Sequence, residues 1–323
     1  MILFLFRRLL QGLAILFTVA TVTFALIHAA PGEPFAAQLE DARFTPEMSA
    51  TLRRQYGLDA PLTTQYARFL TQLVRGDLGN SLSQHRPVRE ILAQALPRTL
   101  VLMSAALAAG FALGVVTGAA QAARAGTRLD RVAGRISVAL SALPDFWLAL
   151  ALMLVFALRL RWFPVSGMMD QTTHEYLTPM GKLRDVLWHL VLPSTTLALV
   201  IGAVVARHQR QALVDILPED FVRSARAKGV RERTVVMRHA LRNALLPTIT
   251  LLGLALPALV GGAVIIENIF GWPGMGRVAL DAIAARDYPV VLGTTMVGSL
   301  LVVLGSLFAD LLSAVVDPRL RRG

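Results

Sequence analysis

Six long apolar runs leave this chain few ways to fold. They lie at about 9–28, 99–120, 136–158, 190–206, 247–266 and 290–312. A bilayer core about 30 Å thick needs roughly 20 apolar residues in an α-helix to cross it. Each backbone amide and carbonyl in lipid must pair within its own segment, so such runs form helices. The sequence therefore predicts an all-α, polytopic membrane protein with six transmembrane helices.

Composition agrees with a membrane protein. Of the 323 residues, 55% are hydrophobic and 16% are charged, whereas about 25% of the residues in soluble domains are charged. The chain has no cysteine, which excludes a disulfide framework, a thiolate metal site and a cysteine nucleophile.

The first apolar run resembles a secretory signal in one respect, because Arg7 and Arg8 precede it. It is longer than the 7–15 apolar residues of a signal core. No small-residue cleavage pattern follows, since His28 stands where one of the small residues would be needed. We expect an uncleaved first helix.

The basic residues are distributed unevenly between the connections. The connections 121–135 and 207–246 hold thirteen Lys and Arg residues, while 159–189 and 267–289 hold six over nearly the same length. Short cytoplasmic connections carry the excess of Lys and Arg. We therefore expect both termini in the cytoplasm. The net charge of +11 then reflects membrane orientation, and it gives little support to nucleic-acid binding.

Motifs for enzymatic chemistry are missing from the sequence. The two lysines, Lys182 and Lys228, are followed by Leu183 and Gly229, so neither belongs to a P-loop. The six histidines form no H-E-x-x-H zinc motif, and there is no G-x-S-x-G nucleophile elbow. We expect no catalytic residue, no metal site and no cofactor in this chain, and any ATP must be bound by another polypeptide.

The basic connection 207–246 carries the most specific pattern. Residues 221–228 predict a short helix with small side chains on one face, and Gly229 suits the left-handed position that ends such a helix. A second helix is expected from about Arg231 to Leu245, with Pro247 at the start of the fifth span. Two interpretations are open: an amphipathic basic hairpin on anionic lipid, or a helical projection that enters a groove in a partner protein.

The amino-acid sequence of this connection resembles that of a known family. Residues 219–247, EDFVRSARAKGVRERTVVMRHALRNALLP, look like the cytoplasmic coupling loop of binding-protein-dependent ABC importer permeases, in particular the dipeptide/oligopeptide branch. HAAPGEP, RRQYGLDAPLTTQY, GDLGNSL, ENIFGWPGMGR, RDYPVV and VDPRLRR agree, so the resemblance covers nearly the whole chain. One departure is Asp220-Phe221, where Glu-Ala often begins the loop.

The resemblance implies a type I ABC importer transmembrane fold and an ATP-driven permease subunit for dipeptides, oligopeptides or a similar small solute. The implied partners are a homologous permease subunit, two cytoplasmic ATPases and an extracytoplasmic solute-binding protein, at the bacterial inner membrane. It implies an organisation into 1–94, a transmembrane domain at 95–316 and a cytoplasmic tail at 317–323. The implied coupling residues are Arg223, Ala225, Arg226, Ala227, Lys228, Gly229, His239, Leu246 and Pro247.

Charged residues within apolar runs are costly and are therefore candidates for function. Asp145 follows Pro144 near the middle of the third run, and it either lines a translocation path, pairs with a neighbouring helix or is hydrated at the Pro144 break. Glu267, at the outer end of the fifth run, either lines the outer mouth or is a solvated helix end. For Asp310 a structural ion pair with the C-terminal arginines is favoured.

Three further segments carry recognisable patterns, and two of them are open to two interpretations. In 29–98, helical spacing of Tyr66, Phe69 and Leu70 predicts a short amphipathic helix, which either covers the bundle or receives a soluble partner. Gly110, Gly114 and Gly118 predict close helix packing. The run FGWPGMG at 270–276 is either a re-entrant loop or a tight turn with an interfacial tryptophan.

Two other classes of function are weaker. A secondary transporter needs inverted repeats and ion-binding residues at the membrane midplane, and only Asp145 suits that role. A membrane scaffold gives no reason for the pattern at 223–247.

Overall fold

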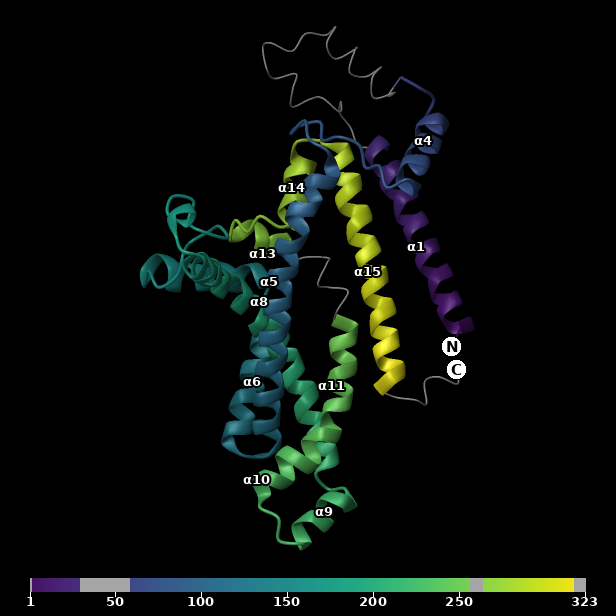
Figure 1. The fold of residues 1–323 in the computed structure, drawn as a ribbon. Helices are drawn as coiled ribbons and strands as arrows, with labels where there is room; N and C mark the ends of the chain where they lie inside the picture. The colour runs from purple at the N-terminus through teal and green to yellow at the C-terminus, as the bar shows by residue number, and fades with distance from the viewer. Residues whose placement is uncertain (1, 30–58, 256–263, 317–323) are drawn as a thin grey trace. The chain divides into compact units, whose positions relative to one another are not determined.

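The structure is a computed structural model that describes residues 2–29, 59–255 and 264–316. In these ranges the regular elements are helices, and an isolated bridge joins Asn80 to Pro87. The α-helices are α1 (Ile2–Ala29), α4 (Leu62–Val74), α5 (Val88–Ala122), α6 (Arg128–Ala142), α7 (Asp145–Leu152), α8 (Pro179–Ile216), α9 (Asp220–Ala227), α10 (Glu232–Thr234), α11 (Leu241–Ala255), α13 (Val264–Ile269), α14 (Met275–Ala284) and α15 (Tyr288–Val316) (Figure 1). Shorter helical turns are the π-helices η1 (Met153–Arg159) and η3 (Val235–Ala240) and the 3-10 helix η2 (His174–Tyr176).

Four of the expected membrane spans are confirmed as long apolar helices. They are Phe6–Ala29, Val88–Ala122, Pro179–Ile216 and Tyr288–Ala309. The fourth expected span, 190–206, is indeed longer at both ends, because α8 runs from Pro179 to Ile216. The fifth, 247–266, lies partly outside the described residues.

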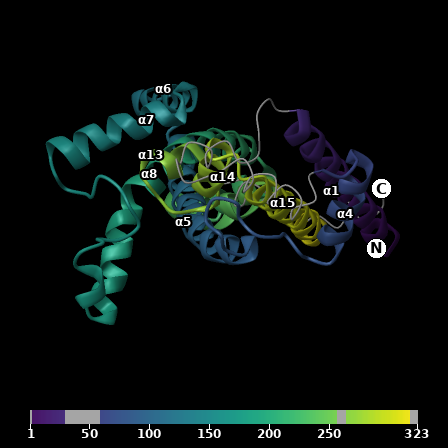
Figure 2. The same ribbon diagram turned by 90° about the horizontal axis from the view of Figure 1, so that it is seen from above.

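The third expected span is not one straight helix. The backbone is extended at Leu143 and Pro144, and the helices Arg128–Ala142 and Asp145–Arg159 meet at 106°. Proline lacks a backbone N–H and disfavours helical geometry in the residue before it, so Leu143 ends α6. Figure 2 shows α7 turning away from α6 at this point. The continuous helix expected at 136–158 is therefore wrong, and a broken span takes its place.

The described residues fall into two compact units. The first draws its residues from 1–99 and 273–303, and the second from 100–272 and 304–323.

In the first unit, α4 packs beside the C-terminal half of α1. The Tyr66 hydroxyl lies 2.6 Å from the Thr21 hydroxyl, and the ring of Phe24 contacts Tyr66 and Phe69. The amphipathic helix expected here is confirmed, and its aromatic face covers α1.

A buried carboxylate organises another part of the first unit. Asp287 is 1% exposed and precedes α15. It accepts hydrogen bonds from the Ser81 hydroxyl at 2.5 Å and from the Ser83 amide and hydroxyl at 3.0 and 2.7 Å. The Val290 amide also donates to it, at 3.4 Å. Asp287 therefore caps α15 and fixes the loop before α5 with one side chain.

In the second unit, α5 and α8 approach until their backbones nearly touch. A Cβ atom added to Gly114 would lie 2.5 Å from the Cβ of Val205 and 2.9 Å from the Gly202 carbonyl oxygen. One added to Gly118 would lie 2.5 Å from the Ala206 carbonyl oxygen, and Gly110 is similarly close to Ile201. The expected role of these glycines in packing is confirmed.

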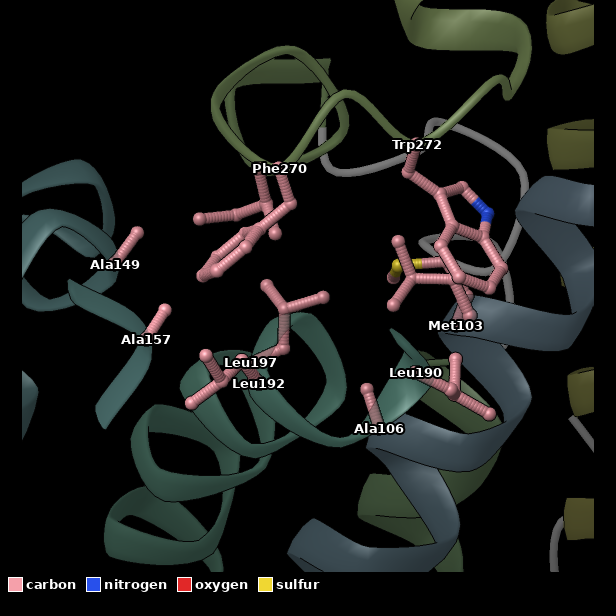
Figure 3. Close-up of a cluster of buried hydrophobic side chains, with 11 residues drawn as sticks. Met103, Ala106, Ala149, Ala157, Leu190, Leu192, Leu197, Phe270 and Trp272 are labelled. Atoms are coloured by element: carbon pink, nitrogen blue, oxygen red, sulfur yellow. The ribbon is translucent and has the colours of Figure 1, made fainter. Parts of the chain in front are cut away.

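One hydrophobic core of this unit gathers around Trp272 and Phe270. Both side chains are buried, at 0% and 2% exposed, and they point toward Met103 and Leu197 (Figure 3). Trp272 is therefore not an interfacial tryptophan. The turn is instead closed by Gly271, whose φ is +60°, and by the Trp272 amide, which donates to the Glu267 carbonyl at 2.7 Å.

Candidate functional site

The segment from α8 to α11 forms the expected helix, glycine turn and helix (Figure 1). Val222 and Ala225 anchor α9, at 0% and 7% exposed, in a second hydrophobic core with Leu213 of α8 and Val235 of η3. Burial of such side chains stabilises the segment without any partner chain. The helix, the glycine turn and the following helix are thus held in place by the hydrophobic core of this chain itself.

Gly229 ends α9 as predicted. Its φ is +75°, which β-branched side chains rarely adopt. The Gly229 amide donates to the Arg226 carbonyl at 2.9 Å, and the Val230 amide donates to the Ala225 carbonyl at 3.3 Å. This pair of hydrogen bonds is a Schellman motif, and the contact of Val230 with the same core accompanies it.

The small side chains of α9 do not share one face, which corrects the expectation. Ala225 is buried, whereas Ser224 and Ala227 are exposed. On a helix of 3.6 residues per turn, Ser224 and Ala227 lie opposite the anchors Val222 and Ala225. The side of α9 that points away from the core is therefore small at its centre, and the exposed side chains of Arg223 and Lys228 flank it.

An ion pair spans the turn, and the sequence analysis missed it. The Nη2 and Nε atoms of Arg226 lie 2.7 and 3.1 Å from the two carboxylate oxygens of Glu232. Nη1 of Arg226 also donates to the Leu217 carbonyl at 3.3 Å. The hydrogen bonds from Arg226 hold the pKa of the Glu232 carboxyl below its ordinary value. Opposite charges on either side of a glycine turn are the signal that could have found it.

The second helix continues further than expected. It runs from Glu232 through η3 into α11, so Pro247 lies inside a helix and does not begin one. A membrane helix tolerates proline where neighbours satisfy nearby backbone groups. Here Gln209 of α8, 0% exposed, donates to the Ala244 carbonyl at 3.3 Å and accepts from the Thr248 hydroxyl at 2.7 Å.

The other expected coupling residues lie on the outside of this helix. His239, Leu246 and Pro247 are exposed. His239 lies in the π-helical turn η3, a kind of turn that is frequent at functional sites.

The two candidates for a translocation path occupy different surroundings. Asp145 is exposed and begins α7 directly after the bend, so it does not lie at the middle of a continuous span. Glu267 is 0% exposed in α13, so the interpretation as a solvated helix end is wrong. The structure does not bring Asp145 or Glu267 together with α9.

Taken together, the membrane-length helices and the braced helical turn that follows α8 define a polytopic membrane protein. The chain belongs to the family described as binding-protein-dependent transport system inner membrane component. The model of that family matches residues 110–322, and the model of its N-terminal region matches residues 1–103.

Relatives match over nearly the full length. The oligopeptide transport system permease protein AppB of Bacillus subtilis (strain 168) is 37% identical over 322 residues, which cover 98% of each chain. The di/tripeptide transport system permease protein DppB of Pseudomonas aeruginosa is 37% identical over 333 residues, covering 99% of each. The glutathione transport system permease protein GsiC of Salmonella paratyphi A is 35% identical over 318 residues, covering 98% of each.

The fold matches a solved importer. A chain of the MetNI methionine ABC transporter in inward-facing conformations superposes with a TM-score of 0.53 at 18% identity, covering 71% of this chain and 97% of that chain. The type I ABC importer transmembrane fold is therefore confirmed. The chain is a multi-pass inner-membrane permease subunit of an ATP-driven importer, and the secondary-transporter and scaffold hypotheses are set aside.

Proposed function

We propose that this permease subunit carries dipeptides, oligopeptides or a similar small peptide-like solute. The support comes from relatives that match over nearly the full length of this chain and are permease proteins of oligopeptide, di/tripeptide and glutathione transport systems. An extracytoplasmic binding protein delivers the solute, and a homologous permease subunit and two cytoplasmic ATPases complete the complex. Both termini lie in the cytoplasm, in keeping with the excess of Lys and Arg in 121–135 and 207–246.

In this proposal, the conformational change of the ATPase subunits is transmitted to this chain through α9. The observation that carries this proposal is the outward side of α9, where Ser224 and Ala227 are exposed while Val222 and Ala225 fix the helix to the core. Small side chains let a partner groove close around the helix. A rigidly anchored helix transmits displacement to the helices on either side of the turn, so closure of the ATPases drives alternation between two access states.

Asp145 and Glu267 belong to the translocation path in this proposal. Glu267 is fully buried in α13, and ionisable residues within membrane segments are rare and commonly functional. Asp145, at the exposed beginning of α7, is placed at a break that can move.

A cross-linking experiment tests the assignment of α9. This chain has no native cysteine that could form competing disulfides. In the complete complex, Ala227→Cys is expected to form a disulfide with cysteines placed along the groove of an ATPase subunit. Thr71→Cys, exposed on α4, is the control and should form none. Equal cross-linking by both variants, or none by Ala227→Cys across all groove positions, would refute the assignment.

Uptake by the complex reconstituted with its binding protein tests the solute. Labelled dipeptides, longer peptides and glutathione are supplied in turn, with a free amino acid as the control. ATP-dependent accumulation of a peptide supports the proposal, and accumulation of a non-peptide solute alone contradicts it.

A further inference from the structure

The exposed side of α6 carries a row of arginines that has no role in the proposed coupling mechanism. Arg128, Arg131 and Arg135 are exposed, and their spacing of three and four residues places them on one side of the helix. Arg124, in the preceding turn, is exposed as well. Among the described residues, no ion pair is formed by these four side chains.

The nearby acid is already occupied. Asp130 is the one carboxylate in residues 121–142, and it is 5% exposed. Nε and Nη2 of Arg210 on α8 lie 2.6 and 2.8 Å from its two oxygens, and the Gly126 amide donates to it at 2.9 Å. Asp130 therefore fastens α6 to α8 and leaves the arginine row without a counter-charge.

An apolar stripe runs beside the arginine row. Leu129, Val132 and Ile136 are 44%, 53% and 54% exposed. Each follows an arginine of the row by one residue, so the two stripes are neighbours on the same exposed side of α6. A cationic stripe next to an apolar one matches a molecule with an anionic head and a hydrocarbon tail.

We propose that this face of α6 binds the headgroup of an anionic phospholipid, with Arg128, Arg131 and Arg135 at the phosphate and the apolar stripe against the acyl chains. With both termini in the cytoplasm, the lipid belongs to the cytoplasmic leaflet. The positive-inside rule requires only that basic residues are numerous in the connection. It does not require alignment along one side of a helix beside exposed apolar residues, and that alignment is the basis of the proposal.

The test measures which lipids stay with the protein. The full chain, in its complex, is extracted from vesicles of equal parts phosphatidylcholine and phosphatidylglycerol, and the retained lipids are quantified by mass spectrometry. The variant is Arg128→Gln/Arg131→Gln/Arg135→Gln. The control, Arg159→Gln/Arg161→Gln/Arg184→Gln, removes the same charge from three other exposed positions of the same unit.

The wild type and the control are expected to retain phosphatidylglycerol in preference to phosphatidylcholine. The α6 variant should lose that preference by at least about fivefold, the effect of one arginine contact at an anionic surface. Equal preference in all three proteins would overturn the proposal. So would loss of the ATPase subunits from the α6 variant with lipid retention unchanged, because the row would then be a protein contact.

Two additions keep the test decisive. If the triple variant fails to fold, Arg131→Gln alone is combined with a salt titration of the wild type, whose preference should fall as ionic strength rises. Inorganic phosphate is added in a parallel extraction. If millimolar phosphate displaces the lipid completely, the row is a free-phosphate site and the assignment to a lipid is wrong.

Discussion

Arg226 and Glu232 meet across the turn at Gly229, and the two charged groups join in a bidentate pair with N–O distances of 2.7 and 3.1 Å. Arg226 at the same time reaches the Leu217 carbonyl before α9. One guanidinium thus fastens both ends of α9.

Breaking this ion pair should weaken coupling more than stability. Arg226→Gln and Glu232→Gln are each expected to lower uptake per ATP hydrolysed several-fold. Without the ion pair, α9 is held less firmly and transmits less of its displacement to the flanking helices. The loss of folding stability should stay below about 1 kcal/mol, as for exposed pairs, since the side chains are 39% and 61% exposed. Uptake and hydrolysis are measured together in liposomes. The exchanged pair Arg226→Glu/Glu232→Arg should recover part of the ratio, and no recovery would count against the pair.

The same pair predicts a dependence of stability on pH. Because Arg226 holds the pKa of Glu232 below its ordinary 4.5, the contribution of the pair is complete above about pH 4.5. It is lost as the pH falls through the lowered folded-state value. The difference in melting temperature between wild type and Glu232→Gln should be constant near neutral pH and vanish in acid. A difference that grows on acidification would contradict this.

Gly229 should tolerate only residues that accept a positive φ. Gly229→Val is expected to abolish most uptake and the stimulation of ATP hydrolysis while leaving membrane insertion intact, because a β-branched residue is strained at φ +75°. No atom lies within 4 Å of an added Cβ, so the effect comes from the backbone alone. Gly229→Asn, which adopts this conformation more readily, is the control and should retain most activity. Normal uptake by the valine variant would show that the turn is not needed.

The glycine contact between α5 and α8 should be sensitive to one methyl group. Gly114→Ala places a Cβ at 2.5 Å from the Val205 side chain and is expected to destabilise the protein by about 1–3 kcal/mol. Gly298→Ala, on α15 with nothing within 4 Å, is the matched control. Melting in mild detergent measures both, and equal melting temperatures would refute the close contact.

Asp287 should hold the loop before α5. Asp287→Ala leaves the Ser81 hydroxyl buried without its acceptor, at a cost of about 1–3 kcal/mol, and is expected to expose residues 79–88 to protease. Asp281→Ala, with a side chain that is 69% exposed, is the control. Protease resistance in both variants would show that other contacts hold the loop.

The local elements of this protein could be predicted, because each depends on neighbours in sequence. The glycine turn at Gly229, the amphipathic helix at 62–74 and the small-residue face of α5 follow from spacing alone. The solute-binding and coupling roles of single residues stay predictions.

Prolines show where sequence reasoning fails. Pro193 and Pro247 lie inside unbroken helices, whereas Pro144 separates two helices at 106°. All three stand in apolar runs, and only the packing around each decides whether the helix continues. The burial of Glu267 and the reach of Arg226 to Glu232 likewise depend on the folded chain, and hydropathy carries no information on either.

The glycine contact between α5 and α8 also limits how this protein can change shape. At these glycines only side chains of α8, such as those of Val205 and Ile201, stand between the two backbones. The contact leaves little room for sliding, and we expect this part of α5 and α8 to translate and rotate as one body. The displacement between access states must then be absorbed by the segments that flank the pair. The bend at Pro144 and the π-helical turn η3 have the incomplete α-helical hydrogen bonding that permits such hinge motion, which makes them the places to look for changes in backbone geometry during the transport cycle.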